Sequence, residues 1–386
     1  MNALRRYPVP AVVLVTFAVA SFVVEGMKPT QAMPPFAQAY GMNCEVCHAV
    51  VPALNAYGRY VQRTGYASLD AATIHHVNPF WLGEQLTYNT GDANFPNRIV
   101  PGNVSLHAAG LLGNDFTFHL HEWFVNDGEP GFTDTLWIGY NNLLHRDGHL
   151  VVGKIEPPGP SPFSQWFDLS GFATPEIVVG EHSYGLDGNR WGTKLTYVHD
   201  WLVADVAYLG PNGDLNTATA FNGTTDRTFQ WRAAYARPDR PIEGGLYGAT
   251  GSFPISDGTF DHYTAVAAYV EIDPQGYRPG LLTMYQVGYD PDPAAGAPPT
   301  HSKAFTAEVW ESLFDNRGML GLRDEVTDDG MGTVTHSGNV DLELVIMRHV
   351  TERGARGLFL NGESALSGGS TPGWKAQLGY YTTFGQ

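Results

Sequence analysis

The sequence predicts a mainly β protein: a transmembrane β-barrel of about sixteen antiparallel strands, preceded by a short α-helical segment. Three observations favour this fold class. From about Phe80 onward, apolar and polar residues alternate with a period of two in short segments. Clusters of Gly, Pro, Asn and Asp separate these segments. Trp and Tyr gather near the segment ends, as in the aromatic girdles of membrane barrels. A large soluble β-sandwich is the competing interpretation.

The N-terminus has the features of a secretory signal peptide. Arg5 and Arg6 supply a positively charged start, and an apolar run follows from Ala11 to Val24. That run has signal-peptide length and is short for a membrane span. Small residues up to Ala32 offer a cleavage site, and an uncleaved membrane anchor is the alternative.

We divide the chain into a signal peptide (1–32), a front segment (33–75) and a barrel (76–386). The 386 residues carry a formal net charge of −17. An acidic protein repels nucleic acid and concentrates cations, so we expect no nucleic-acid partner. Export with a cleaved signal peptide and a lipid-facing barrel predict the outer membrane of a Gram-negative bacterium.

The front segment contains the motif Cys44-Glu-Val-Cys47-His48, which is the attachment pattern of a c-type haem. Each thiol can form a thioether with a haem vinyl group, and His48 then becomes the proximal axial ligand of the iron. A thioredoxin-like redox site needs a βαβ context, and a zinc site needs further Cys or His residues nearby. Neither is present near these two cysteines, which are the only ones in the chain. We therefore predict one covalent haem c.

The residues after the motif predict a helix that packs on other parts of the protein. Leu54, Tyr57 and Val61 repeat at helical spacing, and Gly65 is well placed to end the helix. This apolar stripe faces the haem or simply forms one side of an amphipathic helix. A front segment of about 40 residues seldom buries enough surface to fold alone. We therefore expect this cytochrome segment to plug or cap the barrel.

The distal ligand of the iron is left open by the sequence. Met33, His75 and His76 are candidates within the front segment. A residue after a cleavage site and a polar linker are the alternative interpretations of these positions, and an open or water-bound iron also fits. Two barrel histidines, His119 and His121, are further candidates.

The segment from Phe116 to Phe124 allows its two faces to be assigned. With a two-residue turn at Asn114-Asp115, one face is apolar except for Glu122 and should meet lipid; it carries Phe116, Phe118, Leu120 and Phe124. The other face should meet the lumen; it carries Thr117, His119, His121 and Trp123. The two histidines could ligate haem iron, bind a metal ion, relay protons or line water.

Two kinds of connection stand out between the predicted strands. The Pro-rich stretch from Pro157 to Pro175 is too long for a tight turn, so it folds into the lumen, covers the mouth or forms a surface loop. Other connections carry acidic clusters, such as Asp324 to Asp329. Carboxylates attract hard divalent cations such as Fe²⁺, although solvated acidic loops explain each cluster singly.

The front of the chain contains a set of short motifs within about residues 32–66: Ala32–Gly41 (AMPPFAQAYG), the Cys44–His48 motif, Pro52–Arg59 (PALNAYGR) and Gly65-Tyr66. With these motifs it resembles the outer-membrane cytochrome–porin fusions of iron-oxidising bacteria. The chain departs from the family pattern at Gln38, Val51 and Gln62. The family's haem role carries over to Cys44, Cys47 and His48 alone.

The resemblance implies a porin-like barrel with a monohaem cytochrome in front, acting as an electron conduit across the outer membrane. Extracellular Fe(II) would be the electron donor and a periplasmic cytochrome or other soluble carrier the acceptor, which makes an Fe(II) oxidase a possible enzyme class. The alternative function is a porin-type solute channel whose haem plug is structural or gates the pore. A soluble haem-binding β protein is the third possibility.

Overall fold

The computed structural model describes part of the chain: residues 40, 46–50, 53–69, 80–90, 98–126, 129–160, 175, 177–184, 186, 188–210, 227–274, 278–314, 318–351, 354–367 and 374–384. No helix in these ranges is long and apolar enough to cross a membrane. Cys44, Met33, His75 and His76 lie outside the described residues.

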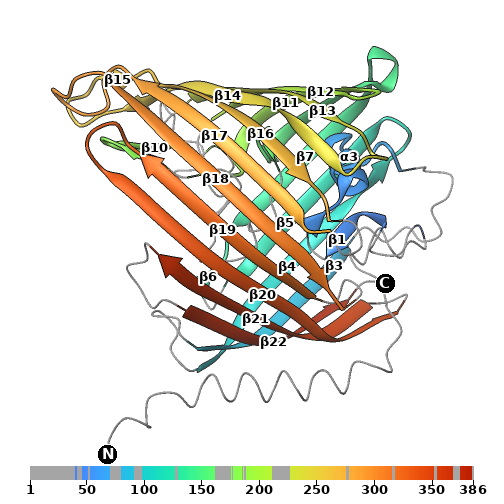
Figure 1. Ribbon diagram of the computed structural model, residues 1–386. Coiled ribbons are helices and arrows are strands. Elements are labelled where there is room, and N and C mark those ends of the chain that lie inside the picture. The colour runs from blue at the N-terminus through green and yellow to red at the C-terminus, as the bar shows by residue number, and fades with distance from the viewer. Residues whose placement is uncertain are drawn as a thin grey trace, which may run out of the picture.

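Sixteen long strands within the described ranges form a closed barrel in which each strand is antiparallel to its neighbours (Figure 1). The first and last of these strands pair with each other, from Leu82 opposite Phe384 to Thr90 opposite Ala376, which closes the sheet. The barrel and its predicted strand number are therefore confirmed. The sixteen strands are β3 (Phe80–Thr90), β4 (Arg98–Leu112), β5 (Phe116–Asn126), β7 (Thr133–Leu143), β8 (Gly148–Ile155), β11 (Arg190–His199), β12 (Leu202–Leu209), β13 (Arg227–Ala236), β14 (Ile242–Pro254), β16 (Thr264–Ile272), β17 (Gly280–Asp290), β18 (Thr300–Leu313), β19 (Gly318–Asp328), β20 (Val334–Thr351), β21 (Gly354–Ser367) and β22 (Trp374–Phe384).

Shorter elements complete the structure. Two-residue strands, β6 (Glu129–Pro130) and β15 (Phe260–Asp261), pair with the last residues of β5 and β14. Two small hairpins lie apart from the barrel sheet: β1 (His48–Val50) with β2 (Ala53–Leu54), and β9 (Ile177–Val179) with β10 (His182–Tyr184). In the described part of the chain, the complete helical elements are α3 (Ala56–Arg63) and the single turn η3 (Leu144–Arg146). The front segment is thus only partly helical within its described residues.

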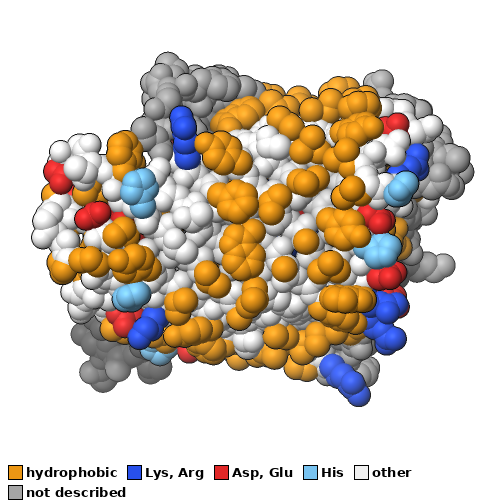
Figure 2. Space-filling model, turned by 90° about the horizontal axis from the view of Figure 1, so that it is seen from above, with side chains coloured by type: hydrophobic (Ala, Val, Ile, Leu, Met, Phe, Trp, Pro, Cys, Tyr) orange, Lys and Arg blue, Asp and Glu red, His pale blue; other side chains and the backbone are white. Residues whose placement is uncertain are grey.

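The barrel wall has an apolar outer face and a largely polar inner face. In β13 and β18, exposed and buried residues alternate along the strand, as the pleat of a sheet requires. Exposed outward residues include Phe229, Leu246 and Phe305, whereas buried inward residues include Asp205, Arg232 and Glu308. Figure 2 shows apolar side chains spread over the outer wall and charged side chains gathered toward its two ends. This distribution is that of a barrel surrounded by lipid.

The two ends of the barrel differ in the length of their connections. At one end, here the short-turn end, the connections are brief: 113–115, 144–147, 200–201 and 237–241. At the other, the long-loop end, residues 156–189 join β8 to β11 and residues 210–226 join β12 to β13. The chain enters β3 and leaves β22 near the short-turn end.

Strand β5 has the two faces that the sequence predicted. Thr117, His119 and His121 face the lumen, whereas Phe116 and Phe124 are exposed on the outer wall. The turn itself differs from the prediction: Leu112 pairs with Phe116, which leaves the three residues 113–115 in the loop. The extra residue is Gly113, whose φ of +74° favours glycine.

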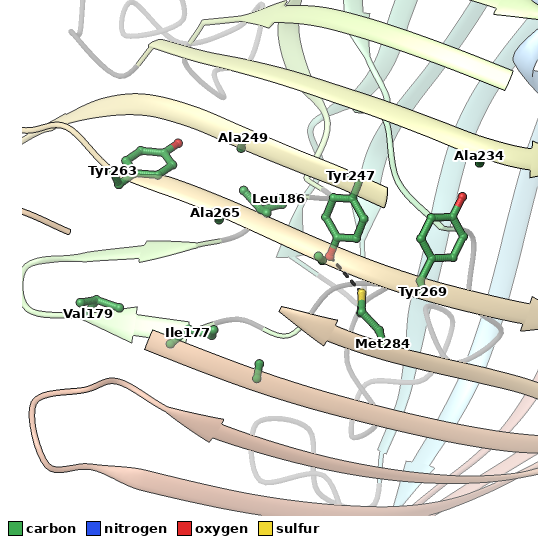
Figure 3. Close-up of a cluster of buried hydrophobic side chains, with 12 residues drawn as sticks. Ile177, Val179, Leu186, Ala234, Tyr247, Ala249, Tyr263, Ala265, Tyr269 and Met284 are labelled. Carbon is green, nitrogen blue, oxygen red and sulfur yellow. Dashed lines mark hydrogen bonds between the residues drawn. The ribbon is translucent and has the colours of Figure 1, made fainter. Parts of the chain in front are cut away.

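Part of the long connection between β8 and β11 lies in the lumen. Residues 161–174, which are most of its Pro-rich stretch, lie outside the described residues, so the arrangement of that stretch stays a prediction. In the described part of the connection, Ile177, Val179 and Leu186 are buried in a cluster with inward residues of the wall, including Tyr247 and Met284 (Figure 3). The amide of Gln230 donates to the carbonyl of Leu186 at 3.0 Å, and Arg232 donates to that of Gly159 at 2.6 Å. The described residues of this connection therefore occupy part of the lumen.

Candidate functional site: a plug in the short-turn end of the barrel

Residues 46–50 and 53–69, here called the plug, lie inside the barrel at its short-turn end (Figure 1). The plug consists of the β1–β2 hairpin followed by α3. Asn55 begins the helix as its N-cap, because its side-chain oxygen accepts the Gly58 N–H at 2.9 Å. The helix ends at Arg63, and the chain then turns at Gly65, whose φ is +54°. The helix stop predicted at Gly65 is thereby confirmed.

Cys47 and His48 lie where the hairpin packs on the start of α3. The Cys47 carbonyl accepts the Asn55 N–H at 3.0 Å. A Cβ on Gly58 would approach the Cys47 carbonyl oxygen to 2.0 Å, so only glycine permits this contact. Cys47 is half-buried, and burial raises the pKa of its thiol. The His48 side chain is 7% exposed, and its backbone pairs with Leu54.

Arg59 fixes the plug to the barrel wall through buried ion pairs. Its guanidinium is 1% exposed and contacts Glu243 at 3.2 Å, Glu271 at 3.0 Å and Asp273 at 2.8 Å. Burial lowers the pKa of Arg59, but attraction to the three carboxylates outweighs burial and leaves it raised. Arg63 adds a second bond to Glu243 at 2.5 Å.

Further contacts extend this docking along the helix. The Ala56 N–H donates to the Asp273 carboxylate at 2.9 Å, at the short-turn end of β16. One turn and a half later, the Gln62 amide donates to Glu156 at 2.5 Å. Burial raises the pKa of Glu156, an effect that Lys194 partly opposes. Helix α3 is therefore held at both of its ends.

The end of the plug packs on the wall formed by β4, β5 and β7. Val61, Tyr66 and Leu69 form a buried cluster with Ala109. The Tyr66 ring stacks on Trp137 at 5.5 Å, and its hydroxyl lies 3.3 Å from His119 Nδ1. Burial raises the pKa of Tyr66, which keeps the phenol protonated. Val61 of the predicted apolar stripe thus packs toward the barrel wall.

His121 lies on the lumenal face two residues beyond His119. Its Nδ1 is 2.9 Å from Asp134, and its ring stacks on His107 with centroids 3.6 Å apart. Its Nε2 is buried and has no hydrogen-bond partner. His119 and His121 are therefore lumenal, as predicted, but they lie toward the far end of the plug from Cys47.

The described part of the chain contains no group of three or more His, Cys, Asp and Glu side chains placed to hold a metal ion. Two small cavities beside the plug, of about 10 and 20 Å³, have room for about one water molecule each. A haem therefore does not fit between the plug and the wall at either cavity. Val46 is exposed and Cys47 is half-buried, so a group bonded to Cys47 need not displace the ion-paired contacts.

The donor set at the motif fits a covalently attached haem. Two thiols at this spacing suit the two vinyl groups, and the imidazole of the next residue suits the iron. Cys47 and His48 lie together in the described residues, whereas Cys44 lies outside them.

The residues that dock the plug on the barrel wall were not predicted from the sequence. Arg59 was recognised only as part of a family motif, and Glu243, Glu271 and Asp273 were not singled out. The sequence does contain one signal for them. Exposed and buried residues alternate along β16, and Glu243 and Glu271 fall at buried, inward positions of β14 and β16, where a carboxylate requires a partner.

Comparison with protein-family models and with curated proteins finds no match. Solved structures with a similar shape include an anion-selective porin from Comamonas acidovorans, with a TM-score of 0.48 and 13% identity over 80% of this chain and 98% of that one. A porin structure refined at 1.8 Å has a TM-score of 0.49 and 13% identity over 79% and 99% of the two chains. The outer-membrane channel DcaP of Acinetobacter baumannii has a TM-score of 0.48 and 10% identity over 80% and 96%.

Proposed function

We propose that this protein is an electron conduit of the outer membrane. It carries one haem c on Cys44 and Cys47, with His48 as the proximal ligand. It accepts electrons from extracellular Fe(II) and passes them to a periplasmic cytochrome or other soluble carrier. The observation that carries the proposal is a haem-attachment motif on a plug docked inside a closed barrel.

The position of the plug supports a periplasmic electron acceptor. Outer-membrane barrels have short periplasmic turns and longer extracellular loops. On this rule the short-turn end faces the periplasm, which puts Cys47 at the periplasmic mouth. A soluble carrier can approach the mouth without entering the barrel.

The barrel residues would control the surroundings of the haem, which when bound supplies a one-electron carrier. Arg59 and Arg63 hold the plug in one position through Glu243, Glu271 and Asp273. Gly58 keeps the motif backbone against α3. A fixed plug maintains a constant degree of solvent exposure, one of the factors that set haem potential.

Two arguments support Fe(II) as the electron donor: the family resemblance and the negative charge of the protein. The net charge of −17 concentrates cations at the protein surface. An acidic loop, Asp328 to Thr333, lies at the long-loop end, where extracellular cations arrive first.

Covalent haem can be tested by haem staining on a denaturing gel. Cys44→Ser and Cys47→Ser should each leave at most one thioether, and the double variant should carry no covalent haem. Undiminished staining of the double variant would contradict the attachment site. For the donor, stopped-flow haem spectroscopy should show reduction when the oxidised protein is mixed with Fe²⁺, and an unchanged spectrum argues against Fe(II).

A porin-type solute channel is the second candidate, because the polar lumenal wall and the sixteen-stranded closed barrel are features of porins. In that case the plug would be structural or would gate the pore. Planar-bilayer recording separates the two functions, since a plugged conduit should conduct few ions and a solute channel many.

A further inference from the structure

We propose that the β9–β10 hairpin is a pH-sensitive strap inside the barrel, fastened to the long-loop end by Glu181. Its two strands are antiparallel, from Ile177 opposite Tyr184 to Val179 opposite His182, and Gly180-Glu181 forms the tip between them. The strap involves no haem and acts independently of the proposed electron transfer. It controls the path through the lumen at the end opposite the plug.

One carboxylate joins the hairpin tip to two connections of the barrel rim. Glu181 accepts the Ser256 N–H at 2.6 Å and the Ser256 hydroxyl at 2.7 Å. It also accepts the Ala295 N–H at 3.2 Å. Ser256 lies between β14 and β15, whereas Ala295 lies between β17 and β18. Hydrogen bonds to an ionised carboxylate are stronger than those between neutral groups, so the charge of Glu181 fastens three separate segments together.

The backbone of the tip contacts the same rim. The Glu181 N–H donates to the Pro293 carbonyl at 2.8 Å. Gly180 has a φ of +58°, and a Cβ there would lie 2.0 Å from the Pro293 carbonyl oxygen. Only glycine therefore allows the tip to come this close to the connection between β17 and β18.

The start of the hairpin lies flat on the barrel wall. Ile177 and Val179 are 1% and 0% exposed and pack among small inward residues such as Ala249 and Ala265 (Figure 3). Val178 is 61% exposed, because successive residues of a strand point to opposite sides. The fastened hairpin thus turns one side to the wall and the other to the lumen.

Acid can neutralise the carboxylate that fastens the tip. The Ser256 hydroxyl and the N–H groups of Ala295 and Ser256 hold the pKa of Glu181 below its ordinary value of 4.5. The negative charge of Asp257 opposes this effect weakly, and the connection between β17 and β18 faces Glu181 with the backbone groups of Pro293 and Ala295. A group with a depressed pKa contributes its stabilisation above its unfolded value and loses it as pH falls through the folded pKa. The strap is therefore fastened above pH 4.5 and released in more acidic solution.

Release of the tip changes the lumen without unfolding the barrel. Ile177 and Val179 still hold the start of the hairpin on the wall, while the tip loses the charge that bound it to the rim. A loose tip at the long-loop end obstructs the path toward the plug. The strap thus keeps this path open near neutral pH and closes it in acid.

Hydrogen exchange of the full-length protein in detergent, followed by mass spectrometry, tests the strap. Glu181→Gln removes the charge and keeps the shape of the side chain. At neutral pH the amides of residues 177–184 should exchange about tenfold faster in this variant, because hydrogen bonds to a charged group are the stronger ones. The wild type should show the same increase below pH 4.5, after correction for the intrinsic effect of pH on exchange. The barrel strands should keep their protection in both proteins.

Asp329→Asn is the matched control for this exchange. Asp329 is a carboxylate at the same end of the barrel, and it accepts the N–H groups of Met331 at 2.7 Å and Thr333 at 2.9 Å within its own turn. Its loss should leave the exchange of residues 177–184 unchanged. An equal increase in this control and in Glu181→Gln would overturn the strap.

Ser256→Ala is a second variant that decides the question if Glu181→Gln disturbs the fold. It removes one donor and keeps the charge, so residues 177–184 should exchange faster than in the wild type but more slowly than in Glu181→Gln. Wild-type exchange of residues 177–184 in either folded variant would refute Glu181 as the fastening group. Wild-type exchange that stays the same in acid would refute the pH-sensitive release.

Discussion

At the scale of single residues, the charge arrangement around Arg59 explains why the plug belongs to the barrel. Glu243 and Glu271 are directly opposite each other on β14 and β16. Like charges in opposite positions of a sheet repel each other. The guanidinium of Arg59 contacts both carboxylates, and Arg63 contacts Glu243 again. The positive charge of the plug thereby offsets the repulsion between these two wall carboxylates.

Arg59→Met should release the plug from the wall. The change leaves buried carboxylates without their partner, a loss of about 3–5 kcal/mol in plug docking. Limited proteolysis in detergent should then cut the plug faster while the barrel stays intact. Arg237→Met is the control, because Arg237 forms an exposed pair with Asp239 and should have little effect. Equal cleavage of both variants would contradict the role of Arg59.

Plug docking should weaken as pH rises, because burial raises the pKa of Glu156 above its ordinary value of 4.5. A carboxyl with a raised pKa in the folded state contributes stability below its unfolded pKa and loses it as pH rises through the folded pKa. The thermal midpoint of the wild type should therefore fall as pH increases from 4.5. Glu156→Gln should reduce the slope of the thermal midpoint against pH. If the variant keeps the wild-type slope, the pH dependence comes from another group.

At the scale of elements, the two faces of a strand were easier to predict than the contacts of the plug. The alternation from Phe116 to Phe124 gave the correct two faces, because the pleat fixes that period. The hairpin β1–β2 was missed, since three residues paired with two carry no periodic signal. The ion pairs of α3 were missed because Arg59 meets residues more than 180 positions away in the chain.

The outer face of β5 allows a test at the element scale. Leu120→Arg places a charge on the lipid-facing side near the middle of the strand, at a cost of about 2–4 kcal/mol. Phe124→Arg, near the strand end, should cost less because the interface is polar. The yield of folded, heat-modifiable barrel after membrane extraction measures the difference. If both variants fold as well as the wild type, the outer face of β5 is not in lipid.

Thr117 shows why a position on the lumenal face does not always tolerate a large charged side chain. The sequence places it in a water-lined lumen, where an arginine would have a mild effect. In the structure Thr117 is 1% exposed, accepts a hydrogen bond from Asn141 and lies against Gly65 of the plug. An arginine there would collide with the plug, so we expect Thr117→Arg to disturb plug docking.

At the scale of the whole molecule, the lumen is occupied from both ends. The plug fills the short-turn end, and the connection with Ile177, Val179 and Leu186 lines the wall toward the long-loop end. The sequence predicted plugging from the small size of the front segment, which alone buries too little surface. The lumenal position of Ile177, Val179 and Leu186 could not be predicted from composition, because the proline-rich stretch before them suits a surface loop equally.

Planar-bilayer recording of the wild type should therefore show far less conductance than an open porin of the same strand number. Deleting residues 46–69 should raise the conductance only in part, since the connection between β8 and β11 remains in the lumen. A variant that also lacks residues 177–186 should conduct most. Full porin conductance in the wild type would instead favour the solute-channel function.

The paired carboxylates on β14 and β16 also bear on how the barrel is assembled. A slip of one residue in a strand turns every side chain of that strand to the other face. After such a slip, either Glu243 or Glu271 would point into lipid, and Arg59 would meet one carboxylate fewer. Only a correctly aligned sheet can bind the plug with its full set of ion pairs. The plug therefore distinguishes correct from incorrect strand alignments, so the segment that contains the Cys47-His48 pair also favours the properly assembled protein.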